Sequence, residues 1–257
     1  MQLSTRANES AELLAGLLAS SDSVVAFTGA GISTESGIPD FRSPGSAWKH
    51  NSPLSFQDFL TSEALQVEAW RRKFAMDDLY RGAQPSTGHK VLARLAHAGR
   101  LDGVITQNID GLHHDSGLTD EQIVELHGNG TYAKCLVCGV RLELAPIREK
   151  LEATGKPPRC LCGGIVKAGT ISFGQSMPQT EMRRAQKLSQ GCDLLIAIGS
   201  SLVVYPAAGF PVIAKESGAR LVIINREPTG LDAASDFVLR GEIGEILGPF
   251  AAPGPLN

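Results

Sequence analysis

Four cysteines in the middle of the chain are spaced as metal ligands. Cys135 and Cys138 form a C-x-x-C pair, and Cys160 and Cys162 follow as a C-x-C pair before two glycines. Two such pairs are typical of a Zn²⁺ site, in which four thiolates complete the tetrahedron and leave no position for water. We therefore expect a structural zinc, although the shorter second pair needs a different turn and could leave one ligand weak or replaced. The fifth cysteine, Cys192, precedes an apolar strand, which predicts buried packing rather than a nucleophile.

A glycine-rich turn follows the first strand-like run and could bind phosphate groups. The run Val24–Phe27 leads into Gly29 and Gly31, and Ser33 has a side chain suited to capping a helix. Such a turn lets backbone N–H groups approach a phosphate, so a dinucleotide is the first ligand to consider. The next glycine is Gly37, however, and this spacing departs from the dehydrogenase fingerprint. On these residues alone, a purely structural turn is an equal alternative.

Polar residues follow two further strand-like runs. The segment TQNIDGLHH, residues 106–114, comes directly after an apolar run and contains two amides, an aspartate and two histidines. Ligands of open α/β sheets bind at the carboxyl ends of strands, so this loop is a candidate site, with a capped turn as the alternative. His127 lies between a second apolar run and a glycine-rich segment. By position alone it could be a zinc ligand, a structural loop histidine or a general base.

The composition is that of an ordinary soluble globular protein. The chain has 257 residues, 42% of them hydrophobic and 20% charged, which suffices for one large domain with an insertion or for two domains. A net charge of -3 gives no electrostatic footprint for nucleic acid or an anionic membrane. The first apolar stretch indicates an amphipathic helix, and no apolar run approaches the ~18 residues of a membrane span. We expect a cytoplasmic protein without targeting signals, with free thiols and a loose C-terminal tail, PGPLN.

Strand-like and helix-like segments alternate along the chain. Most strand-like runs are solid Val, Ile and Leu, which predicts a parallel sheet buried on both faces, with helices on either side. The predicted fold class is therefore α/β with a doubly wound sheet. The predicted strands are 24–27, 103–108, 122–127, 193–199, 219–225 and 236–240, and the predicted helices are 86–99, 180–191, capped by Thr180, and 206–218.

Two stretches interrupt this alternation. Residues 46–84 include a long helical pattern, and residues 131–164 contain four of the five cysteines. We interpret them as a helical insertion and a zinc-binding insertion that together form a smaller module. The predicted nucleotide-binding domain then consists of residues 1–45, 85–130 and 165–257.

Taken in order, the motifs resemble those of one family. They are GAGIS and GIPDFR in the glycine turn, TQNIDGLH, the ELHG histidine, the two cysteine pairs, ISFGQ, IGSSL and IIN. This series resembles the sirtuins, which are NAD-dependent protein deacylases, over roughly residues 22–246. The resemblance implies a Rossmann-like NAD-binding domain with a structural zinc in the smaller module, and it accounts for the unusual glycine spacing.

The resemblance also implies roles for single positions. His127 corresponds to the catalytic base, and Asn108 and Asp110 correspond to catalytic residues in the pocket that receives nicotinamide. The implied NAD-binding positions are Gly29, Ala30, Thr34, Asp40, Phe41, Arg42, Gln107, Asn108, Ile109, Asp110, Gly199, Ser200, Ser201, Asn225, Glu227 and Ile243. The positions against which an acyl-lysine peptide adds itself as a strand are Ile171, Phe173 and Gly174.

The activity implied by the resemblance is NAD-dependent deacetylation of lysine in proteins or peptides. NAD is consumed, His127 takes a proton from a ribose hydroxyl, and the products are nicotinamide, free lysine and O-acetyl-ADP-ribose. Sirtuins that prefer acidic acyl groups resemble one another in a Tyr-x-x-Arg pair where this chain has Lys73 and Met76, so an acetyl or another uncharged acyl group is expected. The alternatives are mono-ADP-ribosyl transfer, NAD hydrolysis and a zinc-ribbon binding module without enzymatic activity. We expect a monomer that binds neither nucleic acid nor membranes.

Overall fold

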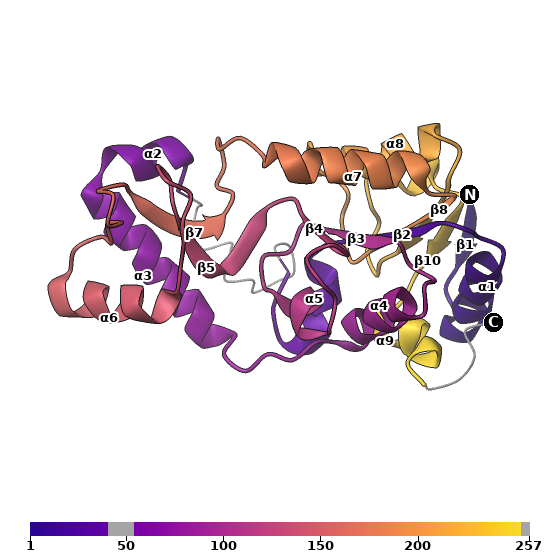
Figure 1. The fold of residues 1–257 in the computed structure, drawn as a ribbon. Helices are drawn as coiled ribbons and strands as arrows, with labels where there is room; N and C mark the ends of the chain where they lie inside the picture. The colour runs from indigo at the N-terminus through magenta and orange to yellow at the C-terminus, as the bar shows by residue number, and fades with distance from the viewer. Residues whose placement is uncertain (41–53, 253–257) are drawn as a thin grey trace.

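The fold is built on one seven-stranded sheet in which every pairing between neighbouring strands is parallel (Figure 1). A computed structural model describes residues 1–40 and 54–252 of the chain. The predicted cofactor residues Phe41 and Arg42 and the predicted tail PGPLN lie outside the described residues. The strands are β1 (Gln2–Ser4), β2 (Val24–Thr28), β3 (Gly103–Thr106), β4 (Ile123–Glu125), β8 (Leu194–Ile198), β9 (Arg220–Ile224) and β10 (Phe237–Leu239).

The order of the strands confirms the doubly wound topology. The sheet runs β1-β10-β9-β8-β2-β3-β4, so the chain winds outward from β2 through β3 and β4 and then returns to the centre. It winds outward again in the other direction from β8 through β9 and β10. The winding direction therefore reverses between β2 and β8, where Ala26 stands opposite Ile196. In such sheets a crevice opens at this point, beyond the carboxyl ends of the strands.

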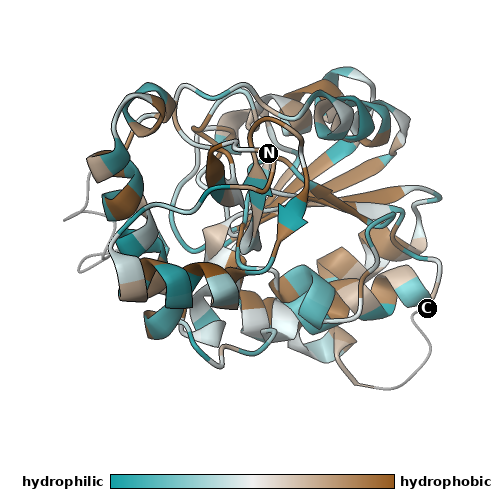
Figure 2. Ribbon diagram, turned by 60° about the vertical axis from the view of Figure 1, so that its left-hand side comes forward, coloured by the Kyte–Doolittle hydropathy of each residue, from teal (hydrophilic) through white to brown (hydrophobic). Residues whose placement is uncertain are grey.

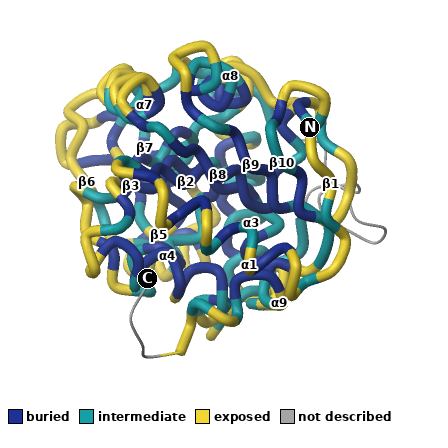
Figure 3. Tube along the Cα trace, turned by 90° about the vertical axis from the view of Figure 1, so that its right-hand side faces the viewer, coloured by how far each residue is buried: buried dark blue, intermediate teal, exposed yellow. Residues whose placement is uncertain are grey.

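Helices cover both faces of this sheet because its strands are apolar on both sides. Val24 and Ala26 pack into a core with α1, α4 and α9, whereas Val25 and Phe27 pack into a second core with α7 and α8. Figures 2 and 3 show the result, a hydrophobic and buried sheet between two helical layers. The helices are α1 (Ala7–Ala19), α4 (Thr87–His97), α5 (Leu112–Asp115), α7 (Gln179–Gly191), α8 (Gly209–Glu216) and α9 (Ile243–Leu247), with short 3₁₀ turns η1 (Ala30–Ser36), η3 (Asp232–Ala234) and η4 (Gly248–Phe250).

The predicted strands and helices all occur, several of them with shorter ends, but both predicted helix caps are wrong. Ser33 lies inside η1, which begins after Gly29 without a side-chain cap, and its hydroxyl is used elsewhere. α7 begins one residue before Thr180, and Pro178 precedes it without a side-chain cap. Among the described helices, none is long and apolar enough to cross a membrane.

The smaller module combines the two interruptions of the alternating pattern, as predicted. Its antiparallel sheet has the order β6-β5-β7, and its core includes Trp70 and Phe74 from α3 together with Cys135 and Val166. The indole Nε1 of Trp70 donates to the carbonyl oxygen of Val166 over 3.3 Å, which ties α3 to β7. The division of the chain into domains at the predicted boundaries stays a prediction. The elements of the module are α2 (Phe56–Thr61), α3 (Glu63–Leu79), β5 (Gly128–Cys135), β6 (Arg141–Leu142), α6 (Leu144–Thr154) and β7 (Val166–Thr170).

Candidate active site

The backbones of two glycine turns touch where the winding of the sheet reverses. The N–H of Gly31, after β2, donates to the carbonyl oxygen of Gly199, after β8, over 2.8 Å. A Cβ atom on Gly31 would lie 2.7 Å from the Cα of Gly199, and Gly199 itself has a φ of +62°. Only glycine fits both conditions. The turn after β2 is therefore built for a close backbone approach, and its spacing follows from packing against the turn after β8.

A polar cluster joins η1 to the loop that follows β3. The hydroxyl of Ser33 donates to a carboxylate oxygen of Asp110 over 2.7 Å. The side-chain amide of Asn108, which is buried, donates to Ser33 Oγ and to the carbonyl oxygen of Gly29, both over 3.2 Å. These bonds fix the amide and the carboxylate at the carboxyl end of β3, where the sequence predicted a ligand site. Ser33 belongs to this cluster, a role that the sequence analysis missed because it read the residue as a helix cap.

The loop after β3 is also held to the turn after β8. The side-chain amide of Gln107 donates to the hydroxyl of Ser200 over 2.8 Å, and the backbone N–H of Gln107 donates to the carbonyl oxygen of Thr28. Ser200 Oγ in turn accepts from the N–H of Leu202 over 3.3 Å. The carboxyl ends of β2, β3 and β8 therefore form one hydrogen-bonded unit.

His127 lies where the large sheet passes into the small one, between β4 and β5. Its Nδ1 is 2.9 Å from the carbonyl oxygen of Gln107. Since a carbonyl can only accept, Nδ1 carries the hydrogen of the neutral ring and Nε2 carries the free lone pair. Burial lowers the pKa of His127, and the bond to Gln107 opposes that shift. The side chain is therefore a neutral base near pH 7, oriented by the loop after β3.

The four predicted metal ligands come together at the far end of the small module. Their sulfur atoms all lie within 4.8 Å of one another, and in the described part of the chain no other such group of three or more potential ligands occurs. The Sγ atoms of Cys135 and Cys162 are 3.5 Å apart, and backbone N–H groups of Cys138 and Val137 lower the pKa of the Cys135 thiol to about 6. The donor set fits tetrahedral Zn²⁺. His127 does not belong to the cluster, and Cys192 is buried, as predicted.

The remaining predicted positions are spread along the crevice and the small sheet. Asn225, after β9, donates its side-chain amide to the carbonyl oxygen of Glu227, and both positions also accept hydrogen bonds from Arg240. Ile243 begins α9 and is buried in the core beneath the sheet. The other cofactor positions in the described residues, which lie in the turns and loops after β2, β3 and β8, are Ala30, Thr34, Asp40, Ile109 and Ser201.

The predicted peptide-binding segment follows β7, which lies at one edge of the described small sheet. The N–H of Ile171 donates to the carbonyl oxygen of His127 over 2.8 Å, and the Phe173 side chain is 68% exposed. Gly174 has a φ of +79°, so the chain turns away there in a conformation that glycine adopts without strain. The segment therefore leads from the candidate base to an exposed aromatic side chain.

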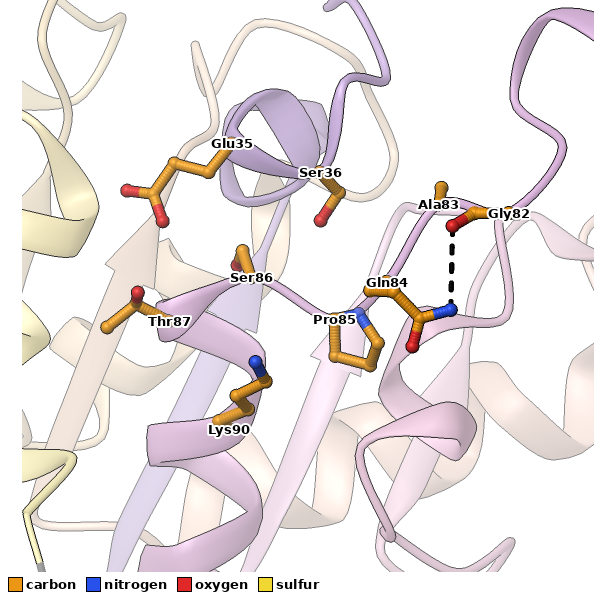
Figure 4. Close-up of a pocket in the computed structure, with 9 residues that line it drawn as sticks. All are labelled: Glu35, Ser36, Gly82, Ala83, Gln84, Pro85, Ser86, Thr87 and Lys90. Carbon is orange, nitrogen blue, oxygen red and sulfur yellow. Dashed lines mark hydrogen bonds between the residues drawn. The ribbon is translucent and has the colours of Figure 1, made fainter.

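A cavity of about 350 Å³ opens between η1 and the start of α4 (Figure 4). Glu35 and Ser36 face it from η1, and Ser86, Thr87 and Lys90 face it from α4. Its lining includes neither His127 nor the polar cluster around Asn108, so the cavity lies beside the candidate site rather than in it.

Comparison with known proteins agrees with this geometry. Residues 29–206 match the sequence profile of the Sir2 family. The chain is 57% identical to an NAD-dependent protein deacetylase of Rhodopseudomonas palustris, over 93% of this chain and 95% of the relative. It is 54% identical to NAD-dependent protein deacetylase 1 of Bradyrhizobium diazoefficiens, over 93% of this chain and 94% of the relative. Among solved structures, a Sir2 variant with deacetylated p53 peptide and 3'-O-acetyl-ADP-ribose has a TM-score of 0.84 and 35% identity, over 92% of this chain and 95% of the other.

Proposed function

The chain belongs to the Sir2 family, and on this premise we propose how its residues carry out NAD-dependent protein deacetylation. The reaction consumes NAD and one water molecule, transfers an acetyl group from lysine to ADP-ribose, and yields nicotinamide, O-acetyl-ADP-ribose and free lysine. NAD supplies the ribose carbon that accepts the acetyl oxygen. The residues of this chain bind NAD, orient the acetyl-lysine and move a proton.

The two glycine turns hold the phosphates of NAD in this proposal. Gly29, Ala30 and Thr34 on one side and Gly199 to Ser201 on the other border the crevice between β2 and β8, where open α/β sheets bind dinucleotides. The absence of a Cβ on Gly31 and Gly199 lets the two turns pack backbone to backbone beside this crevice. Further along the same sheet edge, Asn225 and Glu227 bind the adenosine ribose and Ile243 borders the adenine.

The polar cluster around Asn108 receives the nicotinamide. Asp110 offers carboxylate oxygens to the N–H groups of the nicotinamide amide, and the hydrogen bond from Ser33 holds that carboxylate in place. Asn108 is oriented by its two donated bonds. A polar pocket of fixed geometry holds nicotinamide apart from the ribose carbon at which its bond breaks, and positioning of this kind makes the weakly nucleophilic acetyl oxygen effective.

His127 is the general base, and the observation that carries this role is the hydrogen bond from its Nδ1 to Gln107. That bond leaves Nε2 free to take a proton from a ribose hydroxyl, and the lowered pKa keeps the ring unprotonated near neutral pH. The substitution His127→Ala is expected to lower turnover by about 100-fold to 10,000-fold. It is also expected to leave the zinc content unchanged, because His127 is not among the clustered ligands.

The decisive experiment weighs every product formed from an acetyl-lysine peptide, with and without NAD, by mass spectrometry. Loss of the acetyl group only with NAD, together with O-acetyl-ADP-ribose in equal amount, supports the proposal. Free ADP-ribose or ADP-ribosylated protein beside an unchanged peptide would replace it with hydrolysis or mono-ADP-ribosyl transfer. His97→Ala is the matched control, since His97 is a surface histidine on α4, away from the site.

The peptide binds as an added strand in this proposal. β7 pairs with β5 on one side and forms one edge of the described small sheet, so its other side can pair with an extended peptide. Ile171, bonded to the carbonyl oxygen of His127, continues from β7, and Phe173 and Gly174 follow it away from the base. An acetyl-lysine at the matching position of the peptide would then reach into the crevice beside the base.

The preferred acyl group is uncharged. Lys73, on α3, forms an ion pair with Asp77, so its charge is already compensated. A Cβ on Gly130 would lie 3.8 Å from Cε of Lys73, and the N–H of Gly130 donates to Ile109 of the nicotinamide loop, which places Lys73 near the acyl site. A succinyl group would therefore find no free bidentate cation there. Succinyl-lysine peptide deacylated as fast as the acetyl peptide would contradict this specificity.

The zinc, the compartment and the assembly complete the proposal. The four cysteines would hold Zn²⁺ as a structural ion, and the ion would keep the ends of β5 and the following hairpin together. Five cysteines without a disulfide suit a reducing compartment, which supports the predicted cytoplasmic location. That the protein acts as a monomer, without nucleic acid or a membrane, stays a prediction, and light scattering would measure its mass.

A further inference from the structure

Two buried histidines lie side by side behind the nicotinamide loop. His89, from the first turn of α4, is 0% exposed and His113, from α5, is 3% exposed. Their ring centroids are 4.7 Å apart and their planes are inclined by 60°. One ring nitrogen of each, His89 Nε2 and His113 Nδ1, is buried and has no hydrogen-bond partner in the described part of the chain. Buried polar atoms without a hydrogen-bond partner are unfavourable, so the lack of partners for these two nitrogens needs an explanation.

The partners of His89 determine which of its nitrogens carries the hydrogen. Nδ1 lies 3.2 Å from the backbone nitrogen of Ser86, and a backbone N–H can only donate. The hydroxyl of Ser86 lies 2.8 Å from the carbonyl oxygen of Ile32, next to Ser33 of the polar cluster, and 2.8 Å from Nδ1 of His89, so its one hydrogen is shared between these two acceptors. Nδ1 of His89 is therefore an acceptor, and the hydrogen of the neutral ring is on Nε2. Figure 4 shows Ser86 at the start of α4, facing η1.

The partners of His113 show that its unpaired nitrogen, Nδ1, carries no hydrogen. Its Nε2 lies 2.9 Å from Thr28 Oγ1, and that hydroxyl donates its single hydrogen to Thr106 Oγ1 over 2.8 Å. Nε2 of His113 must therefore be the donor, which leaves Nδ1 as a bare acceptor. Thr106 Oγ1 also accepts from the backbone N–H of Asn108 over 3.0 Å. A donor on His89 and an acceptor on His113 thus remain unpaired on two adjacent rings.

Both rings are neutral, so these tautomers persist at working pH. Burial lowers the pKa of His89 to about 4, against an opposing effect of Asp110. Burial also lowers the pKa of His113 well below 6.5, and the neighbouring His89 and His114 lower it further. Neither ring accepts a second proton near pH 7.

We propose that His89 Nε2–H and His113 Nδ1 close a hydrogen-bonded relay, directly or through one buried water molecule, that positions the nicotinamide loop. The relay consists of Ser86, His89, His113, Thr28 and Thr106. It begins at Ile32, beside Ser33, and ends at Asn108. Since Ser33 and Asn108 are bonded to each other, the relay and the polar cluster form a closed circuit. His89 and His113 are therefore positioning residues, and this role rests on the proposed placement of nicotinamide beside Asn108.

The first test reads the tautomers in the unmodified, zinc-loaded protein, without substrate. Histidine ¹⁵N–¹H correlation spectra are expected to show the hydrogen on Nε2 of both His89 and His113, and on Nδ1 of His127. His97→Gln, His89→Gln and His113→Gln spectra assign the signals. A hydrogen on Nδ1 of His113, or a doubly protonated ring in either residue at pH 7.5, would overturn the relay. This test does not depend on activity, so it separates failure of the relay from failure of the proposed function.

The second test measures whether the two histidines act as one unit. We expect His89→Leu and His113→Leu each to weaken nicotinamide inhibition of deacetylation about fivefold, the effect of one lost hydrogen bond, with little change in the KM for peptide. In the double variant, nicotinamide inhibition is expected to weaken no further than in the more strongly affected single variant. In His97→Leu it is expected to be unchanged. A shared positioning role would be refuted if the fold-changes of the two single variants multiplied in the double variant. It would also be refuted if the KM for peptide changed by the same factor as nicotinamide inhibition.

Discussion

Mild acid is expected to destabilise this protein at a pH where ordinary carboxylates are still ionised. In the unfolded chain His89 titrates near pH 6.5, whereas in the folded protein burial lowers its pKa to about 4. Between these values the unfolded state binds the proton and the folded state does not, so acid favours unfolding. The contribution is fully present above pH 6.5 and is lost as the pH falls toward 4. Since one pKa unit is worth about 1.4 kcal/mol, His89 alone accounts for about 3 kcal/mol.

Other groups determine how steep the total effect becomes. The pKa values of His113 and His127 are also lowered by burial, so each adds to the loss with the same sign. Each histidine that is protonated only in the unfolded state adds up to about 1.4 kcal/mol per pH unit. Glu125 acts in the opposite direction, because burial raises its pKa and its contribution is lost as the pH rises. Three histidines oppose this one carboxylate, so the free energy of unfolding is expected to fall as the pH falls.

Urea unfolding at a series of pH values between 4.5 and 8 measures this slope. The comparison that matters is between the unmodified protein and His89→Leu, because zinc loss at low pH affects both alike. We expect the variant to lose less stability between pH 7 and pH 5, by about 2 kcal/mol. His97→Leu, which removes an exposed histidine from the same helix, is expected to keep the full slope. Parallel pH profiles for the unmodified protein and His89→Leu would refute the reasoning.

Two further predictions concern the glycine turns and the cysteines. Gly31→Ala is expected to destabilise the protein by about 1 to 3 kcal/mol in thermal unfolding, because its Cβ would lie 2.7 Å from the Cα of Gly199. Gly16 lies on the exposed face of α1, where an added Cβ would have no atom within 4 Å, so Gly16→Ala is expected to stabilise the protein by about 0.5 to 1 kcal/mol. Equal effects of the two substitutions would contradict the packing argument. Cys138→Ser is expected to reduce the zinc content measured by mass spectrometry from one per chain, whereas Cys192→Ser leaves it intact. Equal zinc loss in both variants would exclude the clustered site.

The large sheet could be predicted because its strands are buried on both faces. Runs such as residues 194–198 and 220–224 are apolar at every position or nearly so, and few other elements share that pattern. β1 could not be found in this way, since it has three residues, two of them exposed, and pairs only at the sheet edge. β5 includes two glycines and one lysine, and its pairing with β7 depends on chain segments far apart in the sequence.

The polar loops at the strand ends were also visible in the sequence, but their internal bonding was not. Ser33 satisfies the local rule for a helix cap, yet its hydroxyl bonds to Asp110, far along the chain. No local pattern reveals such a partner. His89 and His113 had even less signal, because one begins a helix and the other lies in a short turn. Only the fold brings the two rings together, and only the hydrogen-bond directions distinguish the relay from ordinary packing.

The hydrogen bond from Trp70 to Val166 can form only some time after Trp70 has been synthesised. The two residues are 96 positions apart, and the core of the small module needs both of them. At about 5 to 20 residues per second, a ribosome takes roughly 5 to 20 s to make the intervening chain. During that interval the stacked rings of Trp70 and Phe74 have no β7 to pack against. The nascent protein therefore exposes this aromatic face of α3 until β7 has been made and the core of the small module can form.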